Sequence, residues 1–209
     1  KGAFSVYIPK FFEITDKEVI YDFIEHNSFG ILVSIRNQRP FATHLPLILD
    51  REREILSGHL AIANEQSAEL EGQEALVIFQ GAHHYISSSW YETRQSVPTW
   101  NYVSVHVYGT VELIRDGNDL WQHLLAITEK YERDSTYRID ETNKDFVQSL
   151  MRGIVGFRLR MKRCEGKWKL SQNHSPERRE RVIQQLESIP SEDARQIAEL
   201  MRKEMEYSP

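Results

Sequence analysis

The sequence predicts a mostly β protein, a β-barrel to which helices are added, and three observations carry this prediction. Six or more short runs rich in Val, Ile, Thr and aromatic residues are broken by turn residues, as strands are. Amphipathic stretches with helical spacing lie between these runs and at the end of the chain. A chain of 209 residues is also long enough to bury a core without a metal or a disulfide, and its single cysteine, Cys164, cannot form an internal disulfide.

The first half of the chain begins with a helix over residues 15–27. Thr15 followed three residues later by Glu18 predicts a capping box at the start of this helix. Three strands follow, joined by turns that are typical of hairpins. Asn64 suits the N-cap of a short helix that ends near Gly72. The strands are expected over 30–36, 41–49 and 55–60, with turns over 37–40 and 50–54.

The second half also combines strands with helices. Two short strands lead into a polar loop whose length is usually a mark of function in a compact domain. The longest strand of the chain comes next, followed by helices and strands in turn. These elements are strands over 75–80 and 83–87, the loop over 87–99, a strand over 100–114, helices over 120–131 and 144–151, strands over 154–164 and 168–170, and closing helices that start at Ser175 and Ser191.

Charge is spread unevenly along the chain. Residues 158–181 hold nine basic and three acidic side chains, so this window carries +6 and the rest of the chain, whose total is −5, carries −11. An acidic protein is not expected to bind nucleic acid indiscriminately. No apolar run approaches the roughly 20 residues that cross a membrane. With no sign of an oxidising compartment, we expect a cytoplasmic protein without a membrane partner.

Motifs for catalysis, metals and common nucleotides are missing from the sequence. No spacing of the eight histidines matches a zinc ligand set, and one cysteine cannot supply a thiolate pair. His44 and His59 lie on adjacent expected strands, where hydrogen-bonded structural histidines are the more common case. There is no Gly-x-Ser-x-Gly elbow, Walker loop or Gly-x-Gly-x-x-Gly loop. We therefore predict no catalytic residue and no metal site.

Small polar residues stand on three stretches that otherwise favour apolar strands, residues 42–46, 58–64 and 98–102. A phosphate needs backbone N–H groups, hydroxyls and a cation, and a helix start at Asn64 would offer the first of these. A flat heteroaromatic ring needs an apolar slot with a few fixed polar contacts. Trp90, Trp100 and Tyr102 are candidates for the walls of such a slot, although aromatic residues of a barrel more often belong to its core.

The sequence also resembles the PaiB family, in order from about Tyr7 to about Ile183. The blocks that carry the resemblance are residues 7–12, 42–47, 58–64, 97–102, 105–109 and 166–173. It implies the FMN-binding split β-barrel fold with C-terminal helices, in homodimers that hold flavin at the subunit interface. It also implies a split-barrel domain over residues 1–173 and a helical extension, packed on the barrel, over residues 174–209.

Together with the polar strands, the resemblance implies a set of FMN-binding residues. They are Thr43, His44, His59, Asn64, Trp100, Tyr102, Lys169, Gln172 and Asn173. The first two would contact the isoalloxazine ring or the ribityl chain, and the next two would face the phosphate. The aromatic pair would wall the site, and the last three would close it, in one arrangement from the partner subunit. Residues 60–70 contain no Lys or Arg, so this segment offers the phosphate no charge-assisted donor.

The function that the resemblance implies is negative regulation of transcription, affecting degradative-enzyme and sporulation genes. Two alternatives stay open: a flavin-dependent oxidoreductase on the same fold, and a protein-interaction module without cofactor that uses the helix over 191–207. No helix-turn-helix pattern is present, so the candidate DNA contacts are the alternating residues Arg158, Arg160 and Lys162. Such a stripe is more often a solvated face paired with acidic neighbours, and indirect regulation fits the acidic balance better.

Overall fold

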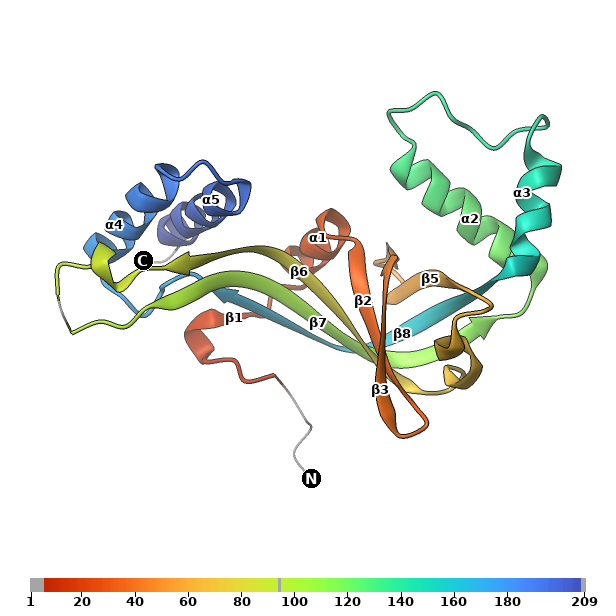
Figure 1. The fold of residues 1–209 in the computed structure, drawn as a ribbon, viewed down its shortest axis with the longest axis horizontal. Helices are drawn as coiled ribbons and strands as arrows, with labels where there is room; N and C mark the ends of the chain where they lie inside the picture. Colours follow the sequence, from red (N-terminus) through yellow and green to blue (C-terminus); the bar gives the residue numbers. More distant parts are fainter. Residues whose placement is uncertain (1–5, 94, 208–209) are drawn as a thin grey trace. The chain divides into compact units, whose positions relative to one another are not determined.

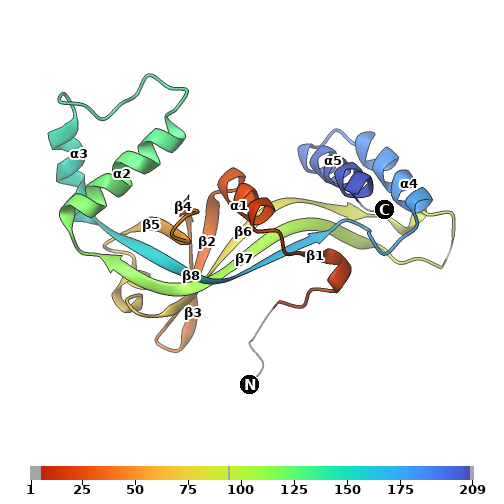
Figure 2. The same cartoon turned by 180° about the vertical axis from the view of Figure 1, so that it is seen from behind.

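The computed structural model describes residues 6–93 and 95–207, and Figures 1 and 2 show its ribbon from two sides. The strands are neighbours in the order β3-β2-β6-β7-β8-β5-β4, and β1 pairs with β8. The strands are β1 (Glu13–Ile14), β2 (Phe29–Arg36), β3 (Arg39–Pro46), β4 (Ile48–Asp50), β5 (Ile55–Ala61), β6 (Glu74–Ile86), β7 (Thr99–Ile114) and β8 (Ile154–Lys169). The helices are α1 (Lys17–His26), α2 (Gly117–Tyr131), α3 (Lys144–Leu150), α4 (Pro176–Glu187) and α5 (Glu192–Tyr207), with short 3₁₀ helices at Lys10–Phe12, Glu65–Glu69, Ser88–Trp90 and Met151–Gly153.

The chain divides into two compact units, and the long strands β6, β7 and β8 each contribute to both. Unit 1 consists of Lys1–Ile20, Gln80–Val105 and Glu165–Pro209, and unit 2 consists of Tyr21–Phe79 and His106–Cys164. Helices α4 and α5 therefore belong to the same unit as one end of each long strand. The domain boundary at residue 173 stays a prediction. Among the described residues, no helix combines the length and the apolar character that crossing a membrane requires.

In unit 2, the turn between β2 and β3 sets the register of that hairpin. Asn37 and Gln38 have φ angles of 48° and 59°, the positive values of a type I′ turn, whose twist matches that of paired strands. The resulting antiparallel register pairs Arg36 with Arg39 and Leu32 with Thr43. The turn expected over 37–40 is thus confirmed, and the polar Thr43 lies opposite a fully buried leucine.

The alternation along β5 places the core of unit 2 on one side of this strand. Leu56, Gly58 and Leu60 are buried, and the residues between them are less so. A Cβ on Gly58 would lie only 2.9 Å from the ring of Phe157, so the core leaves no room for a side chain there. Because neighbouring side chains of a strand point to opposite faces, His59 lies on the side of β5 away from this core.

In unit 1, helices α4 and α5 lie side by side in both views (Figures 1 and 2). The Ser175 side chain caps α4 by accepting from the backbone N–H of Arg178, and Pro176 occupies the first turn, as the sequence predicts. The apolar stripes of both helices are buried, namely Val182, Ile183, Leu186, Ala194, Ile197, Ala198 and Met201. The stripe of the last helix is therefore part of the core rather than a free surface for a partner.

Two pairs of predicted strands are single strands in the structure. Residues 75–80 and 83–86 lie in the continuous strand β6 (Glu74–Ile86), although the buried positions change phase at Gly81, from Ala75, Val77 and Phe79 to Ala82 and Ile86. Residues 154–164 and 168–170 belong largely to one strand, β8, which continues to Lys169 because the backbone at Gly166 pairs with Ile14 of β1. The breaks expected between residues 80 and 83 and between residues 164 and 168 were therefore wrong.

Two further boundaries differ from the prediction. The helix expected over 15–27 starts at Lys17, because Asp16 and not Thr15 caps it: Asp16 Oδ1 accepts from the backbone N–H of Glu18 at 2.9 Å. The strand expected over 41–49 is divided into β3 and β4, with the buried Leu47 between them. The remaining expected helices and strands are confirmed to within a few residues.

Candidate functional site

Thr43 and Asn64, two of the expected flavin contacts, lie together in unit 2. The Asn64 amide donates a hydrogen bond to Thr43 Oγ1 at 3.0 Å, and Asn64 Oδ1 accepts from the backbone N–H of Gln66 at 3.0 Å. Asn64 is thereby the cap of the 3₁₀ helix Glu65–Glu69, as the sequence predicts. The side chain of Gln66 is 1% exposed and donates to the carbonyl of Leu32, which fixes the helix start against β2.

A cation that the sequence analysis missed reaches the same helix start. The Arg36 guanidinium, at the end of β2, donates to Glu65 Oε2 at 2.6 Å, one residue after Asn64. Arg36 Nε is buried and has no hydrogen-bond partner in the part of the chain that the structure describes. The search over residues 60–70 did not find this arginine, because the β2–β3 hairpin and not the local sequence brings it there. A buried N–H without an acceptor is costly unless a ligand supplies one.

His59 contacts a second histidine, His123 of α2, that the sequence did not single out. Nδ1 of His59 and Nε2 of His123 are 3.1 Å apart, so one nitrogen donates to the other. Burial lowers the pKa of His59. Burial lowers the pKa of His123 to about 4, with smaller contributions from His59 and Arg158. His59 thus has a helix partner on the face of β5 opposite the core.

His44 is placed differently from these residues. It is exposed on β3, and its ring centroid lies 6.3 Å from that of Phe29. Because it directly follows Thr43 on a strand, the two side chains point to opposite faces. The two side chains therefore could not both contact an isoalloxazine ring on one face of β3. The expected role of His44 stays a prediction.

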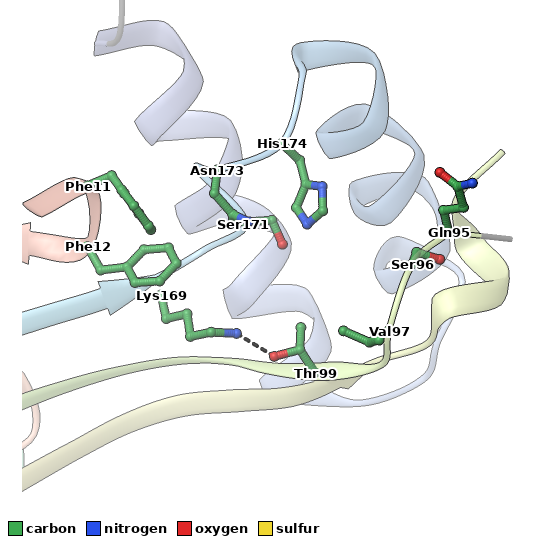
Figure 3. Close-up of a pocket in the computed structure, with 10 residues that line it drawn as sticks. All are labelled: Phe11, Phe12, Gln95, Ser96, Val97, Thr99, Lys169, Ser171, Asn173 and His174. Atoms are coloured by element: carbon green, nitrogen blue, oxygen red, sulfur yellow. Dashed lines mark hydrogen bonds between the residues drawn. The ribbon is translucent and has the colours of Figure 1, made fainter. Parts of the chain in front are cut away.

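The other expected contacts lie in unit 1, and two of them line a cavity of about 380 Å³ (Figure 3). Lys169 Nζ donates to Thr99 Oγ1 at 2.5 Å and to the carbonyl of Trp100 at 2.7 Å. Figure 3 shows this lysine between Phe12 and Thr99, with Asn173 at the other side of the cavity. Lys169 and Asn173 thus line one cavity, and their expected contacts with flavin stay a prediction.

Gln172 has a structural role in this unit. Its Oε1 accepts from the backbone N–H of Leu170, and its Nε2 donates to the carbonyl of Trp168, both at 2.7 Å. Both ends of the amide therefore hold the turn that follows β8, where Ser171 has a φ angle of 65°. The expected flavin contact of Gln172 stays a prediction.

The aromatic candidates also lie in unit 1. Trp100 is 52% exposed, with the rings of His83 and Tyr85 at centroid distances of 5.9 and 6.0 Å. The ammonium of Lys167 lies 5.4 Å from the ring centroid of Tyr102. An exposed tryptophan within an aromatic cluster suits the wall of a binding surface better than a core.

The three basic residues proposed as DNA contacts each have a carboxylate partner in unit 2. The pairs are Arg158–Asp119 at 3.0 Å, Arg160–Glu112 at 2.6 Å and Lys162–Glu74 at 3.7 Å. Each pair is partly exposed, so its contribution to stability is small. The pairing matters more for binding, because neutralised cations attract phosphate less strongly. In residues 6–93 and 95–207, no group of three or more His, Cys, Asp or Glu side chains could hold a metal ion.

Comparison with known proteins identifies the family. The family model "Putative FMN-binding domain" matches residues 6–163. "Protease synthase and sporulation protein PAI 2" of Bacillus subtilis is 40% identical over 205 residues, which cover 96% of this chain and 98% of that protein. The chain belongs to the PaiB family. Family membership supports FMN as the cofactor.

Solved structures show the fold of this PaiB-family chain. The FAD and heme binding protein from Mycobacterium smegmatis superposes with a TM-score of 0.58 at 15% identity, covering 75% of this chain and 73% of that one. A conserved hypothetical protein from Mycobacterium tuberculosis gives the same TM-score and identity, with coverages of 82% and 94%. The expected fold, a mostly antiparallel flavin-binding split barrel with C-terminal helices, is confirmed.

The residues around Asn64 fit a phosphate monoester such as that of FMN. They offer a hydroxyl on Thr43, an amide on Asn64 and a guanidinium on Arg36 whose Nε lacks an acceptor. A guanidinium is the side chain best suited to phosphate, because its fork of donors matches two phosphate oxygens. The structure thus supplies the charge-assisted donor that residues 60–70 do not contain.

Proposed function

We propose that this chain is an FMN-binding, PaiB-type negative regulator of transcription, working as a cytoplasmic homodimer. The observation that carries the proposal is similarity along the whole chain to a Bacillus subtilis protein named for protease synthesis and sporulation. The proposed targets are accordingly genes for degradative enzymes and sporulation. Asn64 and Arg36 supply the phosphate end of the FMN site, together with Thr43, which the family resemblance had assigned to the ring or the ribityl chain.

FMN would bring a redox-active ring and a phosphate to this protein. The phosphate accounts for the arginine and the two small polar side chains around the 3₁₀ helix Glu65–Glu69. The residues of this cluster come from β2, β3 and the segment after β5, so a ligand bound there would hold three segments of unit 2 together. Regulation through this site requires that FMN bind two states of the protein with unequal affinity.

The ion pairs of the basic stripe support indirect regulation over direct reading of DNA. Arg158, Arg160 and Lys162 would each have to exchange a carboxylate for a phosphate on binding DNA. The overall charge of −5 opposes that exchange. A regulator that acts through a protein partner meets neither cost.

Thermal unfolding with FMN and with riboflavin tests the proposed site. A ligand that binds only the folded state raises Tm, so FMN should raise it and riboflavin, which lacks the phosphate, should raise it less. Thr43→Val should reduce the FMN effect, because Val removes the hydroxyl at similar volume. Thr136→Val, in an exposed loop, is the matched control and should behave as the wild type. Equal effects of FMN and riboflavin would contradict a phosphate site.

Transcript measurements test the regulatory part. Deleting the gene from the organism that carries it should raise transcripts for degradative enzymes and sporulation, and the wild-type gene should restore them. Complementation with Thr43→Val should restore them less well if FMN acts through this site. Unchanged transcripts after deletion would contradict the regulatory role and leave FMN binding to be judged by the unfolding experiment.

A further inference from the structure

A cavity lined only by residues of unit 1 has the composition of a binding site for a small organic anion (Figure 3). Its volume of about 380 Å³ lies within the usual range for small-molecule sites. Phe11, Phe12 and Val97 give it apolar walls, and Lys169 and His174 face the space between them. Of these walls, Phe11 and Val97 are exposed, so the cavity opens between apolar side chains.

Lys169 is a half-buried cation without a neutralising partner. Its Nζ donates to a hydroxyl and a carbonyl, and no carboxylate pairs with it in residues 6–93 and 95–207. Burial, and then the charge of Lys167, lower the pKa of Lys169. An ammonium carries three protons, so one donor remains after these two hydrogen bonds. An anion in the cavity would both accept a hydrogen bond from that donor and offset the cost of burying the charge.

His174 lies in the same positive environment. Its ring stacks on Tyr91, with centroids 4.8 Å apart and planes at 25°. Burial lowers its pKa most, and the charges of Arg178 and Lys169 lower it further. Glu92 opposes them, but this carboxylate is engaged by Arg178 Nε at 2.6 Å. The stacked ring therefore faces the cavity beside a lysine whose charge is uncompensated.

We propose that this cavity binds a small organic anion with an apolar body, of the aromatic carboxylate class. The carboxylate would contact Lys169, and the ring would pack on Phe11 and Phe12. This ligand would be distinct from the FMN proposed at Arg36, Thr43 and Asn64, because those residues belong to unit 2 and none of them lines this cavity. The cavity would thus be an effector site. Lys169 and Asn173 would contact this anion and not the flavin.

An NMR titration of the full chain with benzoate tests the proposal. Benzoate should bind at one saturable site, and benzamide, its neutral isostere, should bind about tenfold more weakly or worse. Inorganic phosphate should also bind more weakly, since it has no ring for the apolar walls. Saturating FMN should leave the affinity for benzoate unchanged.

Variants locate the site. Lys169→Met should weaken benzoate binding about tenfold. Lys203→Met, at an exposed position of α5, is the matched control and should bind as the wild type. Should Lys169→Met fail to fold, the comparison of benzoate with benzamide on the wild type still tests whether binding depends on the charge of the ligand. Asn173→Ala then tests whether benzoate binds in this cavity, because Asn173 is an exposed residue that lines it.

Four results would overturn the proposal. Equal binding of benzoate and benzamide would show that the site does not require a negative charge on its ligand. Phosphate binding as tight as that of benzoate would show that the site does not require an apolar ring. Displacement of benzoate by FMN would show that the cavity is part of the flavin site. If benzoate, 2-naphthoate and phenyl phosphate all show no saturable binding up to about 10 mM, the cavity is not a binding site for organic anions.

Discussion

His59 and His123 form a histidine pair between a strand and a helix, with 3.1 Å between Nδ1 of His59 and Nε2 of His123. The two residues are 64 positions apart in the sequence, on β5 and α2. His123 is 6% exposed, and its own Nδ1 has no hydrogen-bond partner among the described residues. Burial lowers its pKa most, followed by the charge of His59 and then that of Arg158 of β8. The surroundings of the pair therefore favour the neutral form of both rings.

This pair predicts that folding stability falls in mild acid. The pKa of His123 is about 4 in the folded protein against about 6.5 when unfolded, so between these values the unfolded state binds a proton that the folded state does not. The stability is fully present above pH 6.5 and is lost as the pH falls through this window, by up to about 3 kcal/mol for His123. Denaturant unfolding of wild type and His123→Leu from pH 7 to pH 4.5 measures it, and the wild type should lose more. Parallel curves would contradict the assignment.

Arg36 is predicted to bind the phosphate of FMN in competition with Glu65. Arg36→Met should weaken FMN binding about tenfold and riboflavin binding much less, because only FMN carries the phosphate. Glu65→Gln should act in the opposite direction and strengthen FMN binding, since it releases the guanidinium from its carboxylate. Arg39→Met, across the same turn, is the control. If both Arg36→Met and Glu65→Gln weaken FMN binding, the pair is structural only.

Gly109 is predicted to be intolerant of any side chain. A Cβ there would lie 2.2 Å from the carbonyl oxygen of Arg160 and 2.4 Å from Cδ2 of Leu159, both in β8. Because one contact is with backbone, the strands would have to move apart, at a cost of at least about 3 kcal/mol for Gly109→Ala. A Cβ at Gly117 would have no heavy atom within 4 Å, so Gly117→Ala should change stability by less than about 1 kcal/mol. Urea unfolding of both variants decides, and similar values would contradict the close approach of β7 and β8.

Asn101 and Ser171 are predicted to act as one unit in the core of unit 1. Both are buried, and the Asn101 amide donates to Ser171 Oγ at 3.0 Å. Asn101→Ala should cost about 1–3 kcal/mol, because it leaves a buried hydroxyl without its partner. Ser171→Ala in the Asn101→Ala background should then cost less than alone, which a double-mutant cycle of unfolding free energies measures. Additive effects would show that the hydrogen bond contributes nothing.

Much of the fold could be predicted because its signals are local. The turn at Asn37 and Gln38, the cap at Asn64 and the start of α4 at Ser175 depend on residues within a few positions of each other. The errors came where tertiary pairing outweighs local preference. Gly166 looks like a break, yet β1 pairs with its backbone and keeps β8 continuous.

The candidate site divides in the same way. Thr43 and Asn64 were found because each belongs to a block that resembles the family, and the structure joins them by a hydrogen bond. Arg36 and His123 were missed because their partners are 29 and 64 residues away in sequence. A search for cations at the ends of paired strands, using the register that the 37–38 turn fixes, could have found Arg36.

A fluorescence titration of the purified full chain with FMN tests the central claim most directly. The flavin fluorescence should be quenched saturably with one FMN bound per chain, and riboflavin should bind more weakly because the donors at Arg36, Thr43 and Asn64 have no phosphate to bind. Absence of saturable quenching would contradict the claim that this chain binds FMN.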